Sequence, residues 1–186
     1  MAIPEALLKD RNFWKRAANH VRTRAGVLPG EAVFDPAPGP GLLAVELART
    51  MPRFRFFVAG PLPPSAPPNI ATAGASPLNA RLPDRGLALV TAALTLDEWP
   101  PKELKRLLTK LEPEIVQSGR VVLLTRLPSP KVPELRTSLI DAVQEGLLES
   151  VGFERVQVEE LEYLPDGTQL GVVHCRRPTR EEDDKG

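Results

Sequence analysis

The chain has 186 residues, and its 24 Lys and Arg residues balance 24 Asp and Glu residues, so its formal net charge is zero. This balance gives no electrostatic signal for nucleic acid or for an acidic membrane surface. The single cysteine excludes a disulfide within the chain and favours a reducing compartment, so we expect a cytoplasmic protein. No apolar run reaches the roughly 18 residues of a membrane-spanning helix, so we expect no membrane partner.

The length fits one domain with a sizeable core. We expect a single domain over residues 1–178, with a helical region at 1–24 and a disordered acidic tail at 179–186. Proline is unusually frequent, with 21 residues, roughly double the usual share. The prolines cluster, and because proline fixes φ and removes a donor, they predict stiff loops between the regular elements.

The first half of the chain predicts helices alternating with short buried strands. Apolar residues at helical spacing predict a helix over residues 4–24, with Phe13 and Trp14 on its buried face. The elements predicted next are a strand at 31–35, a glycine- and proline-rich loop at 36–41, a helix at 42–50, a strand at 54–58 and a short strand at 69–73. Between the second and third strands, residues 60–68 hold five prolines, so we expect the connecting helix to be missing.

The second half continues the alternation and ends differently. The predicted elements are a strand at 87–93, a helix at 101–111, a strand at 119–125, a helix at 133–150 and strands at 153–161 and 169–175. Pro165-Asp-Gly167 predicts a tight turn between the last two strands, which makes the final strand antiparallel. The pattern predicts an α/β fold with a mostly parallel sheet, in which ligands bind beyond the carboxyl ends of the strands.

The segment Val33-Phe-Asp-Pro-Ala-Pro-Gly-Pro-Gly41 resembles the first motif of the class I S-adenosylmethionine-dependent methyltransferases. In that motif a buried strand ends in an acidic residue, and a glycine-rich loop then opens a helix. Weaker matches lie before and after this motif, in the family's order and spacing over residues 13–178: Phe13-Trp14, Leu28-Pro-Gly30, Leu82-Pro-Asp84, Leu111-Glu-Pro113 and Val151-Gly-Phe153. The resemblance implies a Rossmann-like methyltransferase fold with S-adenosylmethionine as the cofactor. The cofactor-binding residues that it implies are Asp35, Ala37, Gly39, Gly41 and, near the adenine, Ser76.

The sequence departs from the family in the loop and after the second strand. Ala37 replaces the first glycine of the loop, and Pro38 and Pro40 lack N–H groups that could face a ligand. The second strand ends in Val58-Ala-Gly-Pro-Leu62, without the acidic residue that accepts hydrogen bonds from the cofactor's ribose in the family. Loss of that acceptor corresponds to about 1–3 kcal/mol, or roughly ten- to a hundredfold in affinity.

No catalytic residue can be named from the sequence. Asp97 follows the fourth strand, where a general base is conceivable, but its position before a proline-initiated helix favours helix capping. His174 and Cys175 are neighbours in a strand and point to opposite faces. With two histidines and one cysteine in the chain, a zinc site is not expected.

Three hypotheses about function follow. The first is a methyltransferase with an eroded cofactor site, acting on a small-molecule or macromolecular acceptor. The second is a catalytically inactive member of the fold that serves as a binding or assembly module and has a protein partner. The third, ranked last, is a different nucleotide-binding α/β protein. Fold alone does not decide among them.

Overall fold

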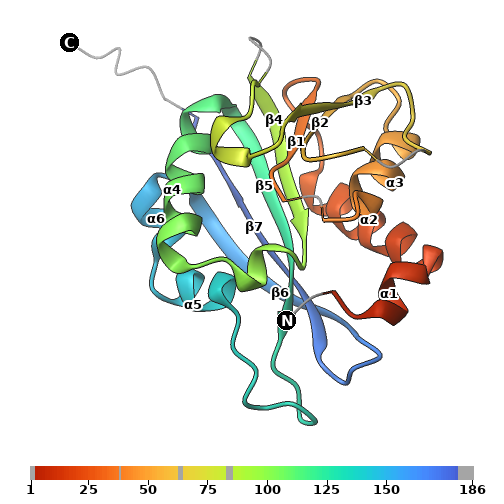
Figure 1. The fold of residues 1–186 in the computed structure, drawn as a ribbon. Coiled ribbons are helices and arrows are strands. Elements are labelled where there is room, and N and C mark those ends of the chain that lie inside the picture. The colour runs from red at the N-terminus through yellow and green to blue at the C-terminus, as the bar shows by residue number, and fades with distance from the viewer. Residues whose placement is uncertain (1–2, 38, 63–64, 83–85, 180–186) are drawn as a thin grey trace.

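The computed structural model of the protein describes residues 3–37, 39–62, 65–82 and 86–179. Within these ranges one seven-stranded sheet lies between two layers of helices (Figure 1). The helices are α1 (Glu5–Lys9), α2 (Arg11–Ala25), α3 (Leu42–Thr50), α4 (Pro101–Leu111), α5 (Ser138–Gln144) and α6 (Leu147–Val151). The strands are β1 (Ala32–Asp35), β2 (Arg55–Ala59), β3 (Ile70–Gly74), β4 (Leu87–Ala93), β5 (Ile115–Leu127), β6 (Glu154–Tyr163) and β7 (Gln169–Arg176).

The strands run in the order β3-β2-β1-β4-β5-β7-β6. The pairs among β1 to β5 are parallel, whereas β7 is antiparallel to both of its neighbours, β5 and β6. The predicted mostly parallel sheet with an antiparallel C-terminal hairpin is therefore confirmed. The strand predicted at 119–125 is longer than expected, because β5 begins at Ile115.

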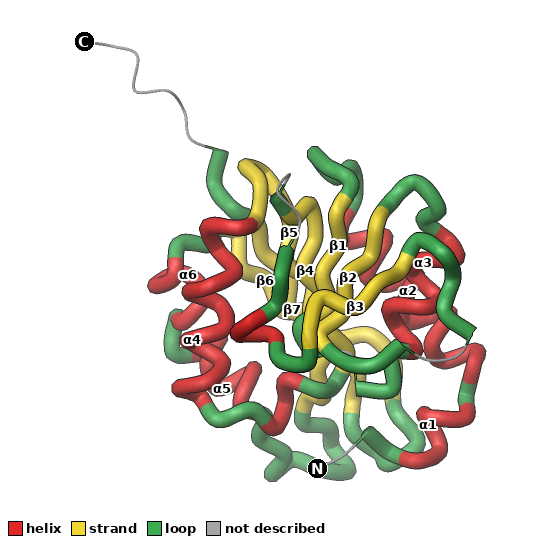
Figure 2. The backbone as a smooth tube through the Cα atoms, turned by 45° about the horizontal axis from the view of Figure 1, so that its top comes forward, coloured by secondary structure: helices red, strands yellow, loops and turns green. Residues whose placement is uncertain are grey.

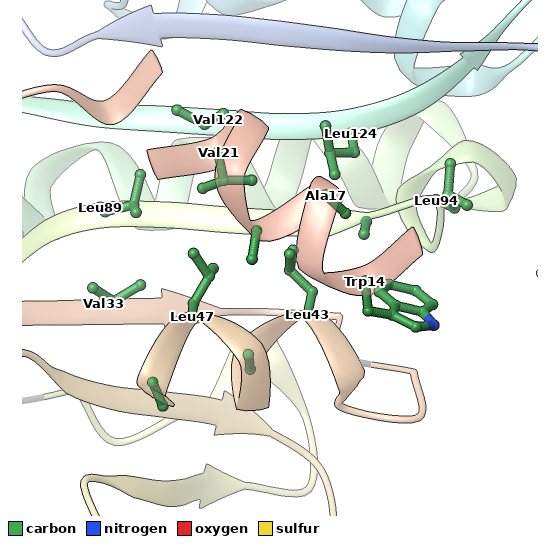
Figure 3. Close-up of a cluster of buried hydrophobic side chains, with 14 of the residues drawn as sticks. Trp14, Ala17, Val21, Val33, Leu43, Leu47, Leu89, Leu94, Val122 and Leu124 are labelled. Atoms are coloured by element: carbon green, nitrogen blue, oxygen red, sulfur yellow. The ribbon is translucent and has the colours of Figure 1, made fainter. Parts of the chain in front are cut away.

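The sheet separates two hydrophobic cores. Because successive side chains of a strand point to opposite faces, Val33 joins the core under α2 and α3, while Phe34 joins the core under α4, α5 and α6. Figure 2 shows these two helical layers on either side of the sheet. In Figure 3, side chains from α2 and α3 meet those of β1, β4 and β5 in the first core. Burial on both faces explains why all seven residues of β4 are buried.

The helix predicted over residues 4–24 is broken into two at Asp10. The Asp10 carboxylate accepts hydrogen bonds from the backbone N–H groups of Asn12 and Phe13, at 2.9 and 3.0 Å. A side chain with these hydrogen bonds caps the start of a helix, so α2 begins after Asp10 and α1 is a separate short helix. The predicted burial of Phe13 and Trp14 is confirmed, with 1% and 3% of their surface exposed.

The prediction of a single helix over residues 133–150 is wrong. Residues 133–137 are not helical, and α5 starts only after Thr137, whose hydroxyl accepts from the N–H of Ile140. Gly146 then adopts φ of 71° and separates α5 from α6. The cap and the left-handed glycine override the apolar periodicity on which the prediction rested.

The two connections of β3, to β2 and to β4, contain no α-helix among the described residues. No helix occurs among the described residues between β2 and β3, as predicted, and the β3–β4 connection has only a 3₁₀ turn, Pro77–Asn79.

No helix of the described chain is long and apolar enough to cross a membrane. Pro38, Asp84 and the predicted tail beyond Thr179 lie outside the described residues, so the division into a domain and a tail stays a prediction.

Candidate functional site

The carboxyl ends of β1 and β4 lie next to each other at the point where the strand order reverses. In open α/β sheets this switch point is where ligands bind. Residues 36–41 leave the end of β1, and residues 94–98 leave the end of β4. These two segments therefore define the candidate site.

The loop after β1 is shaped by Asp35 and two glycines. One carboxylate oxygen of Asp35 accepts a hydrogen bond from the N–H of Ala37 at 3.1 Å, which turns the chain directly after the strand. Gly39 and Gly41 have φ of 52° and 73°, a conformation that L side chains rarely adopt. Gly41 begins α3, where its carbonyl accepts from the N–H of Val45. The glycines of the motif are thus required by the backbone of the turn.

Thr95 connects this loop to the end of β4. Its hydroxyl donates to the carbonyl of Ala37 at 2.5 Å. Its methyl group packs over Gly39, where an added Cβ would come within 3.0 Å of that methyl carbon. The two halves of the site therefore hold each other in place.

Leu94, directly after β4, has an unusual backbone conformation. Its φ is 63°, which is rare for a bulky residue, and its N–H is fixed by the carbonyl of Leu124 at 2.8 Å. Strained backbone of this kind costs roughly 1–3 kcal/mol and is concentrated at functional sites. Its position directly after β4 supports the assignment of the functional site to this end of the sheet.

The Asp35 carboxyl is buried and only half satisfied. The residue is 2% exposed, and its second carboxylate oxygen has no hydrogen-bond partner within the described structure. Burial raises the pKa of Asp35 to about 7, although the hydrogen bond from Ala37 acts in the opposite direction. A buried carboxyl that titrates near neutrality can lose its proton to meet a cationic group.

A cavity of about 350 Å³ lies against these segments. Gly39 and Pro40 line it from the β1 loop, Leu94, Thr95 and Glu98 line it from the β4 end, and Ile3 and Leu8 line it from the N-terminal segment. The walls are mostly apolar, and Glu98 is the one ionisable residue among those lining the cavity. The volume lies at the lower end of the range for small-molecule sites.

The predicted role of Asp97 as a helix cap is wrong. α4 begins after Pro100 without a side-chain cap. The Asp97 carboxylate instead accepts from the hydroxyl of Thr125 at 2.5 Å, and from the backbone N–H and Nε of Arg126 at 3.0 and 3.4 Å. Burial raises the pKa of Asp97, and these hydrogen bonds lower it. Asp97 therefore clamps the end of β4 to β5 beneath the site, and its neighbour Glu98 faces the cavity.

The backbone at the end of β2 has two features that bear on the absence of an acidic residue there. Gly60 has φ of 149°, a conformation in which an acidic residue would be strained. The carbonyl of Gly60 accepts a hydrogen bond from the Thr72 hydroxyl at 2.9 Å, so a neighbouring strand already uses this acceptor. The structure thus gives a backbone reason for the missing carboxylate.

The predicted site residues fall into three groups. Gly39 lines the cavity, whereas Asp35, Ala37 and Gly41 shape the loop around or beneath it. Ser76 stands at the start of the 3₁₀ turn and is not among the residues that line this cavity. The described residues bring together no group of three or more His, Cys, Asp or Glu side chains that could hold a metal ion.

Sequence reasoning missed several residues of the site. The position of Thr95 after the fourth strand was a usable signal, because it shares the carboxyl edge with the glycine loop. Glu98 directly follows Asp97, but no pattern in the sequence distinguished it as a cavity residue. Nothing in the sequence indicated that Ile3 and Leu8 would reach the cavity, because their placement depends on the break at Asp10.

No protein-family model and no curated protein matches the chain. Solved structures do resemble it. The S-adenosylmethionine-dependent methyltransferase SibL has a TM-score of 0.62 at 21% identity, covering 95% of this chain and 60% of SibL. Human N-acetylserotonin methyltransferase in complex with S-adenosylmethionine gives 0.59 at 15%, covering 96% of this chain and 61% of the human chain.

A third similar structure is that of an enzyme named for a different reaction. The [4+2]-cyclase SpnF has a TM-score of 0.68 at 14% identity, covering 89% of this chain and 82% of SpnF. This chain therefore spans about three fifths of the two methyltransferases and most of the cyclase. Such likenesses establish architecture, while the reaction has to be argued from the site. The chain has the Rossmann-like fold of the class I S-adenosylmethionine-dependent methyltransferases.

Proposed function

We propose that the chain binds S-adenosylmethionine between the β1 loop and the β4 end, and transfers its methyl group to a small-molecule or macromolecular acceptor. The observation that carries this proposal is the buried, unpartnered carboxylate oxygen of Asp35 beneath a glycine turn. This oxygen suits a cationic amino group, such as that of the methionyl part. The structural neighbours that bind this cofactor support the proposal.

The residues of the chain would act mainly by positioning and by excluding water. When bound, S-adenosylmethionine supplies an electrophilic methyl group on a sulfonium. Gly39 lets the backbone approach a ligand closely, and Leu94 and Ile3 give the cavity apolar walls against which a bound ligand would displace water. Glu98 is placed to accept a hydrogen bond from the methyl acceptor. Direct methyl displacement needs little acid–base machinery, so alignment of the reactants is the main requirement.

The cofactor site would be an eroded one. The end of β2 lacks a ribose acceptor, and the β2–β3 connection lacks a helix among its described residues. We expect affinity about ten- to a hundredfold below that of a site with the carboxylate. The same observations favour a second candidate, a catalytically inactive scaffold that binds a partner protein. We propose a cytoplasmic location for both candidates, the methyltransferase and the inactive scaffold.

Calorimetric titration with S-adenosylhomocysteine tests the proposal. The wild-type chain should bind it, and Asp35→Asn should bind at least about tenfold more weakly, because the amide cannot offer a negative charge to the amino group. Asp141→Asn is the matched control, since Asp141 lies in α5, away from this cavity, and should bind as the wild type does.

The pH dependence provides an independent check. Because the folded pKa of Asp35 is about 7, binding that needs its ionised form should tighten by up to about tenfold per pH unit between pH 5.5 and 7. Asp35→Asn should lose this dependence. Absence of heat with the wild type at millimolar ligand, without any thermal shift, would overturn the cofactor proposal and leave the scaffold. Equal affinity of Asp35→Asn and wild type would remove Asp35 from its assigned role.

A further inference from the structure

A second cavity, of about 300 Å³, lies where α1, α2 and α3 meet. Its apolar lining comes from all three helices: Leu8, Trp14, Leu42 and Val45. Lys9, Arg11 and Arg49 line it as well, together with Glu46 and Ser65. It is separate from the cavity beside the β1 loop, with which it shares only Leu8 among the residues that line either one.

The charges that line this cavity do not cancel. Glu46 is 7% exposed and is the one acidic residue in the lining, against three cationic ones. Its Oε1 lies 2.7 Å from Nη1 of Arg49 and 3.5 Å from Nε of Arg11, so one carboxylate serves two guanidinium groups. Lys9 pairs with Glu5 at 2.6 Å, but both side chains are more than three quarters exposed, and such pairs contribute little. An excess of positive charge therefore faces an apolar pocket.

Arg49 is also held in place before any ligand arrives, by the Glu46 carboxylate at 2.7 Å, whereas the side chain of Arg11 is 68% exposed. Arg49 additionally donates to the carbonyl of Ser65 at 3.4 Å, and Glu46 is fixed on the buried side of α3. A guanidinium that is already oriented loses less side-chain entropy when it binds an anion. Its remaining N–H groups match the two oxygens of a carboxylate.

We propose that this cavity is a second ligand site, which binds a small carboxylic acid with an apolar body. The carboxylate would lie between Arg11 and Arg49, in competition with Glu46, and the apolar body would cover Leu8 and Leu42, the more exposed apolar residues of the lining. Burial of this apolar surface supplies affinity, and the unbalanced charge selects an anion over a neutral or cationic analogue. The site is independent of S-adenosylmethionine, so it can be present whether or not the proposed function holds.

Octanoate is a suitable probe, measured by calorimetry on the wild-type chain, with octanol and octylamine as analogues that share the apolar body. We expect octanoate to bind and the two analogues to bind at least about tenfold more weakly. Arg49→Gln should weaken octanoate binding by about tenfold, whereas Arg53→Gln, an exposed arginine after α3 that does not line the cavity, should leave it unchanged.

Glu46→Gln distinguishes a true anion site from a general loss of structure. This change removes the competing carboxylate, so octanoate affinity should increase by several-fold, which a misfolded variant would not show. Trp14 fluorescence in a Trp99→Phe background should respond to octanoate and confirm the location. Equal affinity for octanoate and octanol would reduce the cavity to an apolar surface without charge selection. No binding of octanoate, or no gain in Glu46→Gln, would overturn the proposal.

Discussion

The two halves of the sheet differ in how well they are covered. β4 is buried along its whole length, and α4, α5 and α6 cover it together with β5 and β7 (Figure 1). β3, at the opposite edge, exposes Ala71 and Thr72, and the described parts of its connections hold only one 3₁₀ turn. In the family that the chain resembles, this thinner half holds the adenosine. The eroded cofactor site that we propose therefore concerns the less covered half of the sheet.

The largest effect is expected from breaking the clamp in the well-covered half. Asp97→Ala removes the carboxylate that holds Thr125 and Arg126, and leaves the side chain of Arg126, which is 2% exposed, without this buried partner. Removing one member of a buried ion pair costs about 3–5 kcal/mol. Denaturant unfolding should show this loss, while Asp141→Ala, at a half-exposed position of α5 whose ion pair with Arg136 is largely in solvent, should change stability by less than about 1 kcal/mol. A small loss in Asp97→Ala would contradict the clamp.

Asp35 should give the thinner side of the site a distinctive dependence on pH. The folded pKa is about 7, whereas the unfolded chain titrates near 4. The folded state thus keeps a proton that the unfolded state releases, and stability should fall as pH rises from about 4 to about 7, by as much as about 4 kcal/mol. Above pH 7 the contribution is constant.

Asp35→Asn should lack this contribution and be more stable than the wild type at pH 8. The quantity to measure is the difference in free energy of unfolding between the two proteins across this pH range, because other buried carboxyls contribute equally to both. A difference that does not change with pH would show that Asp35 is ionised in the folded state.

A smaller effect is expected where the two halves meet. Lys110 of α4 donates from Nζ to the carbonyls of Leu78 and Pro77, at 2.6 and 3.3 Å. Lys110→Met should cost about 1–2 kcal/mol and speed amide hydrogen exchange around residues 77–80. Lys105→Met, exposed on the same helix, is the control. Unchanged exchange in Lys110→Met would mean that the turn is held by other contacts.

The smallest effect on stability should come from the thin half itself. Ser76→Ala removes a side chain that does not cap the turn it begins, so unfolding should change by less than about 0.5 kcal/mol. We expect its affinity for S-adenosylhomocysteine to fall by about two- to tenfold, the value of one hydrogen bond. Unchanged affinity would exclude Ser76 from the adenine site.

The fold could be predicted well from the sequence wherever local signals agreed with the tertiary structure. The strand 87–93 and the helix 101–111 match β4 and α4 residue for residue, because their apolar patterns coincide with their buried faces. The helix over 133–150 was wrong because Thr137 and Gly146 stop it. In the site, the glycine loop was recognisable, but the cap at Asp10 and the clamp by Asp97 depend on contacts that spacing does not reveal.

The position of β7 has a consequence for the order in which the chain folds. β7 lies between β5 and β6 and pairs with both, although it follows them in sequence. During synthesis β6 therefore lacks its native partner until β7 has been made, and we expect the two strands to join the sheet as a hairpin. Val122 of β5 pairs with His174 of β7 across 52 positions of the sequence, and long-range pairing of this kind slows folding. Until that hairpin arrives, β5 is an open edge, so premature association between newly made chains should occur there.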